Sequence, residues 1–137
     1  MYDFQPNNLF KKTEKTMATI LIAEDNRVNQ RVLMFTLRKE GYNVVTAIHG
    51  REALENMEQY EVDLVIADIE MPEMDGVTLV KHLRADRRYA KLPVIVLTAS
   101  AENEDHSTAM AAGADNVLTK PSSSQELISA VNSMLNA

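Results

Sequence analysis

The sequence predicts a doubly wound α/β domain, with five parallel strands in the order 2-1-3-4-5 and five helices. Five short apolar runs alternate with five stretches whose apolar residues recur at helical spacing. The breakers agree with this pattern, since the glycines at 41, 50, 76 and 113 and Pro72, Pro93 and Pro121 all fall between runs. Strands that alternate with helices are joined by crossovers, so the sheet is expected to be parallel and covered on both faces.

Each expected strand is a short apolar run that ends at a polar residue or a breaker. The first run is followed directly by Glu24 and Asp25, the third by Asp68 and the fourth by Thr98. The expected strands are, in order, Thr19–Ala23, Val44–Ile48, Val62–Ala67, Val94–Leu97 and Asn116–Leu118.

Each expected helix is marked by residues at helical spacing. Gly41 stands at the C′ position of the first helix, where glycine enters the left-handed region freely. Ser123 and Glu126 form a capping-box pattern before the last helix. The marking residues are Val28, Val32, Phe35 and Lys39, with Leu33 and Leu37 beside them; Ala53, Leu54 and Met57; Val77, Val80 and Leu83; residues 102–112; and Leu127, Ile128, Val131, Met134 and Leu135.

Residues 1–17 show no clear period and are interpreted as an N-terminal tail or linker, which leaves residues 18–137 as the domain. This segment nevertheless holds Tyr2, Phe4 and Phe10, three of the seven aromatic residues. The alternative is that these side chains dock on the domain or on a partner.

Composition and charge exclude several classes of function. There is no cysteine, so disulfides, thiolate metal sites and thiol nucleophiles are ruled out. No apolar run is long enough to span a membrane, and the first residues lack the order of a secretory signal, so the cytoplasm and no membrane contact are expected. The formal charge of −6 argues against direct nucleic-acid binding, which needs a basic face. Nine acidic and no basic residues between Glu52 and Asp75 permit a cation site.

The carboxylates after the strands are expected to share one cleft. In doubly wound sheets, ligands bind outside the carboxyl ends of the strands, where the strand order reverses. Glu24 and Asp25 end strand 1 and Asp68 ends strand 3, and these strands are neighbours in the predicted order. Like charges that close require a proton or a cation, and an all-oxygen set suits Mg²⁺, or alternatively Mn²⁺.

Thr98 and Lys120 follow strands 4 and 5, so they belong to the same rim. A hydroxyl and an ammonium beside a carboxylate and a metal can neutralise and hydrogen-bond the oxygens of a transferring phosphoryl group. Asp68 is then the expected nucleophile, which forms an acyl phosphate. Taken singly, each of these residues is more often a cap or a surface residue; the combination at four strand ends carries the prediction.

Four segments resemble the receiver domains of bacterial response regulators: ILIAEDN (20–26), DLVIADIEMPEMDG (63–76), PVIVLTA (93–99) and GADNVLTKP (113–121). Their order and intervals fit that family over residues 18–137. The resemblance implies a flavodoxin-like fold and a phospho-acceptor in a two-component system or phosphorelay. It also implies a donor, either a histidine kinase or a histidine phosphotransfer domain. The segment EDNRVNQ (24–30) is similar to receivers attached to hybrid sensor kinases.

The resemblance also implies residue roles. Asp68 is the phosphorylated residue; Asp25 is a direct metal ligand, Glu24 acts often through water, and the backbone carbonyl of Glu70 is a third ligand. Thr98 bonds a phosphate oxygen once Asp68 is modified, and Lys120 pairs with the carboxylate or the phosphate. The Lys120–Pro121 peptide is expected to be cis.

Two residues depart from the family pattern. Val117 stands where the family often has Tyr or Phe, and Ser122 stands where it often has Phe, so the face formed by the fourth helix, the fifth strand and the fifth helix is expected to signal weakly or by another route. Arg27 and Arg31 lie one turn apart on the helix that commonly meets the kinase or phosphotransfer domain in this family; the alternative is that they belong to a solvated helix face. His49, His82 and His106 are interpreted as surface or packing residues.

Two alternatives to phosphotransfer stay open at this point. A pseudo-receiver would bind partners without accepting phosphate. A phosphohydrolase would need a second Asp two residues after the nucleophile, where Glu70 stands. The domain is therefore expected to be a signalling module and not an enzyme, monomeric or weakly dimeric. It is either a single-domain regulator or a fragment of a longer hybrid kinase.

Overall fold

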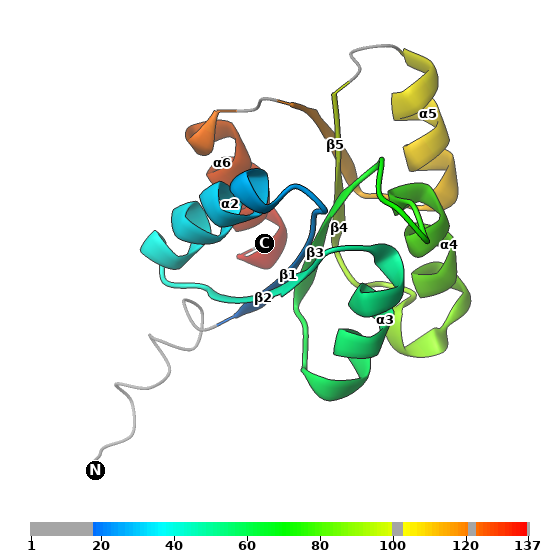
Figure 1. Ribbon diagram of the computed structural model, residues 1–137, viewed down its shortest axis with the longest axis horizontal. Helices are drawn as coiled ribbons and strands as arrows, with labels where there is room; N and C mark the ends of the chain where they lie inside the picture. The colour runs from blue at the N-terminus through cyan, green and yellow to red at the C-terminus, as the bar shows by residue number, and fades with distance from the viewer. Residues whose placement is uncertain (1–17, 100–102, 121–122, 137) are drawn as a thin grey trace.

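A computed structural model describes residues 18–99, 103–120 and 123–136. The chain forms a five-stranded parallel sheet in the order β2-β1-β3-β4-β5, with helices on both faces (Figure 1). Both the fold class and the strand order predicted from the sequence are confirmed. The strands are β1 (Thr19–Ala23), β2 (Asn43–Ala47), β3 (Leu64–Asp68), β4 (Val94–Thr98) and β5 (Asn116–Thr119).

The two central strands explain the apolar runs of the sequence. Every residue of β3 and of β4 is buried, because helices cover both faces of a parallel sheet. The boundaries move by one or two residues from those predicted: β3 and β4 each extend to include their terminal polar residue, Asp68 and Thr98. The edge strand β2 is only partly buried.

The helices are α2 (Arg27–Lys39), α3 (Gly50–Gln59), α4 (Gly76–Ala85), α5 (Asn103–Ala112) and α6 (Ser124–Leu135), with a short 3-10 helix, η1 (Arg87–Tyr89), that the sequence did not predict. Polar side chains cap the N-termini of α2, α4 and α6. The side-chain oxygen of Asn26, Asp75 or Ser123 accepts a hydrogen bond from the backbone N–H three residues later. Gly41 has a φ of 96°, as expected for a C′ glycine.

Two apolar cores lie on opposite faces of the sheet. In Figure 1 the sheet is seen nearly edge-on, with α2 and α6 on one face and α3, α4 and α5 on the other. Alternate strand residues supply the two cores, so Ile20 and Ile22 face α2 and α6, whereas Leu21 and Ala23 face the other helices. The sandwich holds the carboxyl edge of the sheet in a fixed geometry.

The apolar spacing correctly predicted a helix at α2 but did not say which of its faces is buried. Val28, Val32 and Phe35 recur at helical spacing but point outward, with exposed fractions of 70%, 58% and 67%. The buried face of α2 instead carries Gln30 and Leu37. The sequence offered two apolar stripes on this helix, and only the second meets the sheet.

Some expectations fall outside the described residues, namely the tail at residues 1–17, the cis Lys120–Pro121 peptide, and Ser122. Among the residues described, none of the helices has both the length and the apolar character needed to cross a membrane.

Candidate functional site

Three carboxylates meet at the carboxyl edge of the sheet. β1 and β3 are parallel neighbours with Ala23 opposite Ala67, so the residues that follow these two positions emerge side by side. One oxygen from each of Glu24, Asp25 and Asp68 lies within 4.8 Å of the others. They line a cleft of about 770 Å³ together with Glu70 and Lys120. The predicted convergence of the acidic residues is therefore present.

Glu24 and Asp68 are the buried members of this cluster, with exposed fractions of 1% and 5%. The Asn26 N–H donates to Glu24 Oε2 at 3.1 Å, and the Glu70 N–H donates to Asp68 Oδ1 at 3.2 Å. The buried amide of Gln30 donates to the backbone oxygens of Glu24 and Ala47, both at 3.2 Å. These bonds fix the loop that follows β1 relative to β2.

Lys120 is the counter-charge of the cluster. Its Nζ donates to Asp68 Oδ2 at 3.0 Å and to Glu24 Oε1 at 3.2 Å. Burial of the ammonium opposes its charge, but the hydrogen bond and the attraction to Asp68 outweigh burial, so the pKa of Lys120 lies above its usual value. The Lys120 N–H also donates to the Thr98 carbonyl at 2.6 Å, which holds the end of β5 against β4.

Glu24 does not carry its charge easily in this site. Desolvation by burial is the largest cause that raises its pKa to about 7. The hydrogen bond and the repulsion from Asp68 also raise this pKa, whereas the Asn26 N–H and Lys120 lower it. One ammonium thus does not neutralise the cluster fully. A divalent cation among the three carboxylates would relieve the remaining repulsion, and the donors are all oxygen. The residues present fit a Mg²⁺ ion.

The remaining two predicted site residues are placed differently. Glu70 lines the cleft beside Asp68. Thr98 ends β4 with an exposed fraction of 1%, in register with Thr119 of β5, and is not among the residues that line the cleft. β3 and β4 are neighbours with Asp68 opposite Leu97, so Thr98 lies on the strand adjacent to the acceptor.

The cleft also contains residues to which sequence analysis gave no role. Asn26 and Asn29, from the first turn of α2, and Asp75, the N-cap of α4, line it. Asp75 was visible in the Asp–Gly pair that closes the second motif, residues 63–76, but its position depends on the path of the 70–75 loop. That path is fixed by two backbone hydrogen bonds, from Gly76 N–H to the Ile69 carbonyl at 3.1 Å and from Gly50 N–H to the Met74 carbonyl at 3.1 Å.

Fold and site together define a class of protein: a doubly wound α/β domain with an acidic cleft that can bind a metal ion. The cleft lies between β1 and β3, where the strand order of the sheet reverses. The chain belongs to the response regulator receiver domain family, whose model matches residues 20–132. Members of this family are signalling domains of two-component systems that accept a phosphoryl group from histidine kinases on an aspartate, at an acidic site that binds Mg²⁺.

Two curated relatives show different extents of overlap. The alkaline phosphatase synthesis transcriptional regulatory protein PhoP of Bacillus subtilis is 34% identical over 116 residues, which cover 85% of this chain but 48% of that protein. The chemotaxis protein CheY1 of Helicobacter pylori is 36% identical over 110 residues, which cover 79% of this chain and 89% of that protein. The chain thus spans about half the length of the first relative and most of the second.

Two solved receiver domains of histidine kinases are similar in structure. That of a signal transduction histidine kinase from Syntrophus aciditrophicus has a TM-score of 0.82 and 34% identity, covering 87% of this chain and 90% of that chain. The receiver domain of sensor histidine kinase PA1611 from Pseudomonas aeruginosa has a TM-score of 0.82 and 31% identity, covering 88% and 99%. The latter structure has a magnesium ion coordinated in its active-site cleft.

Proposed function

We propose that Asp68 of this domain accepts a phosphoryl group from the phosphohistidine of a partner, with Mg²⁺ bound in the acidic cleft. The observation that carries the proposal is the convergence of Glu24, Asp25 and Asp68 within 4.8 Å, with Lys120 bonded to two of them. An acceptor carboxylate, a cation site and a fixed ammonium are the parts that phosphoryl transfer needs.

In the proposed reaction a carboxylate oxygen of Asp68 forms the new bond to phosphorus as the bond between phosphorus and the donor imidazole nitrogen breaks. The electron pair of that bond returns to the imidazole. Lys120, 3.0 Å from Asp68 Oδ2, stays charged and can bond an oxygen of the phosphoryl group. Thr98 offers a hydroxyl from the adjacent strand.

The proposed metal ligands are the carboxylates of Asp25 and Asp68 and the backbone carbonyl of Glu70, with Glu24 acting through water. Bound Mg²⁺ supplies positive charge that lowers the repulsion between the Asp68 carboxylate and the incoming phosphate. Asp25 is exposed, whereas Glu24 and Asp68 are buried, so the site is open on one side, as Mg²⁺ sites that also bind phosphate commonly are.

The proposed donor is a histidine kinase or a histidine phosphotransfer domain that docks on α2. This helix begins directly after the acidic pair, and its residues Asn26 and Asn29 line the cleft. A partner that brings a phosphohistidine to Asp68 must therefore cover the start of α2, where the exposed stripe of Val28, Val32 and Phe35 begins. Apolar side chains in the centre and Arg27 and Arg31 beside them suit a protein partner.

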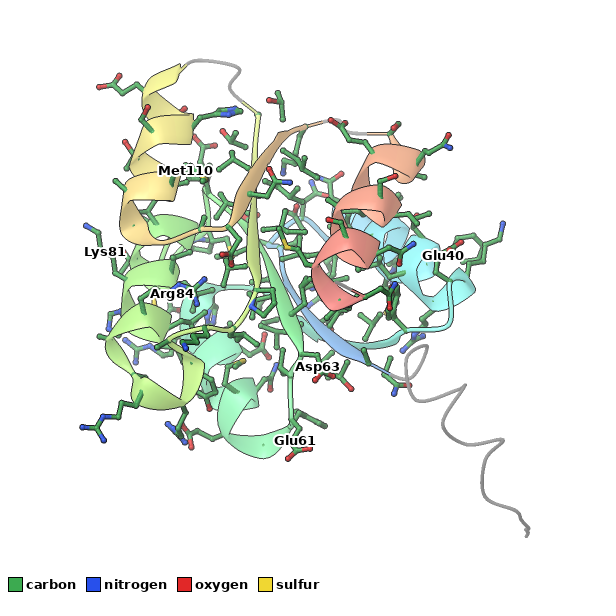
Figure 2. All side chains as sticks on the ribbon, turned by 180° about the vertical axis from the view of Figure 1, so that it is seen from behind. Glu40, Glu61, Asp63, Lys81, Arg84 and Met110 are labelled. Carbon is green, nitrogen blue, oxygen red and sulfur yellow. The ribbon has the colours of Figure 1, made fainter. Side chains whose placement is uncertain are left out.

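The test is mass spectrometry after incubation with acetyl phosphate and Mg²⁺. Wild type should gain one phosphoryl group, whereas Asp68→Asn should gain none. Glu61→Gln is the matched control, because Glu61 is an exposed acid near the opposite end of the sheet (Figure 2). Labelling of Asp68→Asn at the wild-type level would contradict the proposal.

A partner-binding module without phosphotransfer remains the second candidate, favoured by the exposed stripe on α2. Binding of beryllofluoride in the presence of Mg²⁺ separates the two, since it mimics a phosphoryl group on a competent aspartate.

The cysteine-free chain leaves the cytoplasm as the proposed compartment, and the absence of direct nucleic-acid binding stays a prediction.

A further inference from the structure

Helix α5 is held on the sheet by less apolar packing than its neighbour α4. Among its residues whose side chains the structure describes, only Ala109 is fully buried, whereas α4 buries Leu79, Val80 and Leu83. An alanine removes far less apolar surface from water than a leucine or a valine does. The position of α5 therefore depends more strongly on individual polar contacts.

One such contact joins α5 to the end of the sheet. His106 Nε2 lies 3.3 Å from the hydroxyl oxygen of Thr119, a partly buried hydrogen bond between residues 13 positions apart. Thr119 is the last residue of β5, and its partner in register on β4 is Thr98. Neighbouring side chains on one face of a sheet are in contact range.

The three side chains lie on the same side of the sheet. Val96 and Val117 pack into the core that α3, α4 and α5 cover, and Thr98 and Thr119 follow each of them by two positions. Because strand side chains alternate, both threonines face that side. Asp68 ends the strand next to that of Thr98, so Asp68, Thr98, Thr119 and His106 lie on four successive neighbouring elements, β3, β4, β5 and α5.

We propose that His106 is a positioning residue that couples the phosphorylation state of Asp68 to helix α5, through its hydrogen bond to Thr119 beside Thr98. This inference rests on the proposed function and names its regulation. Val117, at the neighbouring position on the same face of β5, has no polar side-chain atom that could form a hydrogen bond with the end of the sheet. His106 on α5 provides such a hydrogen bond, to Thr119.

The packing indicates how a change at Asp68 reaches α5. A phosphoryl group on Asp68 places new acceptor oxygens near Thr98, and a Thr98 hydroxyl that turns toward them changes the space beside Thr119. The hydrogen bond between Thr119 and His106 then changes, and α5, whose apolar packing is weaker than that of α4, shifts with it. Met110, exposed on the outer side of α5, would carry that shift to the surface (Figure 2).

The experiment measures backbone amide chemical shifts of α5 in the full chain, with and without beryllofluoride and saturating Mg²⁺. In wild type, the amides of Asp105, Met110 and Ala112 should move on beryllofluoride binding. His106→Ala and Thr119→Val should still bind beryllofluoride, but the shifts of α5 should shrink at least about twofold, given the usual size of coupling between sites.

Two further variants separate coupling from folding. His106→Gln keeps a side-chain amide in place of the ring nitrogen and should restore most of the response of α5. Ser107→Ala, on the exposed side of the same turn, should leave it at the wild-type level.

Undiminished α5 shifts in both His106→Ala and Thr119→Val, or a wild-type α5 that does not respond to bound beryllofluoride, would overturn the inference while leaving the proposed function intact. Absence of beryllofluoride binding by wild type would overturn both.

Discussion

The buried carboxyl group of Glu24 explains why this site favours a proton or a cation. Its carboxyl group is buried beside Asp68, and one ammonium serves both acids, at 3.2 Å and 3.0 Å. Desolvation is the largest cause of its raised pKa, so the burial itself creates the preference for a proton or a metal. In the absence of metal, the proton that Glu24 binds is part of what stabilises the folded state.

The pH dependence of stability follows from this. The pKa of Glu24 rises from 4.5 to about 7 on folding, so the folded state binds the proton more tightly. Its stabilising contribution is complete below pH 4.5 and is lost as the pH rises through about 7. In metal-free protein, we expect the free energy of unfolding to fall between pH 5 and 8 by on the order of 1–3 kcal/mol from this group. Urea unfolding across that range measures it.

Glu24→Gln is the informative variant in that measurement. It removes the titrating group, so its stability should change less across the same range and should exceed that of wild type near pH 8. Saturating Mg²⁺ should stabilise wild type more than Glu24→Gln near pH 8, because the ion neutralises the ionised carboxyl group. A wild-type profile as flat as that of the variant would contradict the assigned cause.

At the scale of elements, α2 has two faces with different tasks. Its inner face, with the buried Gln30 and Leu37, anchors the helix and the loop after β1. Its outer face exposes Val28, Val32 and Phe35, and Lys39 lies 5.8 Å from the ring centre of Phe35. Beside this face, a groove of about 490 Å³ runs between α2 and α6, lined by Val32, Phe35 and Ile128 among others. Side chains exposed to this extent contribute little to the fold, so the outer face is available to a partner.

Val32→Glu tests that assignment. Transfer to Asp68 from a phosphorylated histidine phosphotransfer domain should slow by about tenfold, since truncation or charging of a central contact commonly costs about 1.4 kcal/mol or more. Labelling by acetyl phosphate should not change, because this small donor needs no docking face. Tyr60→Glu is the control, an equally drastic change at an apolar residue with 49% exposure at the end of α3. Equal loss with both donors would instead indicate damage to the site.

For the molecule as a whole, Arg84 joins several elements on the side of the sheet away from α2. Its guanidinium donates to the carbonyls of Tyr89 (2.9 Å), Leu92 (2.7 Å) and Gly113 (2.9 Å) and pairs with Asp115 at 2.9 Å. Asp115 in turn accepts the Val94 N–H at 2.9 Å. The Arg84 side chain is 18% exposed, so its bonds to the three carbonyls are partly protected from water, whereas Asp115 is 48% exposed. Arg84 thus connects α4, η1, the start of β4 and the end of α5.

Arg84→Met should lower the free energy of unfolding by about 1–3 kcal/mol, because it leaves three partly buried carbonyls without their donor. Lys81→Met, at a residue labelled on the same helix in Figure 2, is the control and should change stability by less than about half a kcal/mol. Denaturant unfolding at pH 7 compares the two. A similar small effect of both substitutions would show that the network contributes little.

The sequence by itself determined the order and type of the elements, because hydrophobic period, glycines and caps are local signals. It also determined which polar residues follow each strand, and parallel pairing then brings Glu24, Asp25, Asp68 and Lys120 to one edge. Strand ends were off by one or two residues and η1 was missed, since short 3-10 turns and the last pair of a ladder depend on neighbouring segments.

Only the tertiary structure decided which of the two apolar stripes on α2 would be buried, because spacing along a helix does not say which face meets the sheet. It also decided that Lys120 bonds two carboxylates at once, that Glu24 loses its water, and that His106 contacts Thr119. These facts depend on distances between segments far apart in the chain, and the free energies of burial and pairing exist only once those segments have packed together.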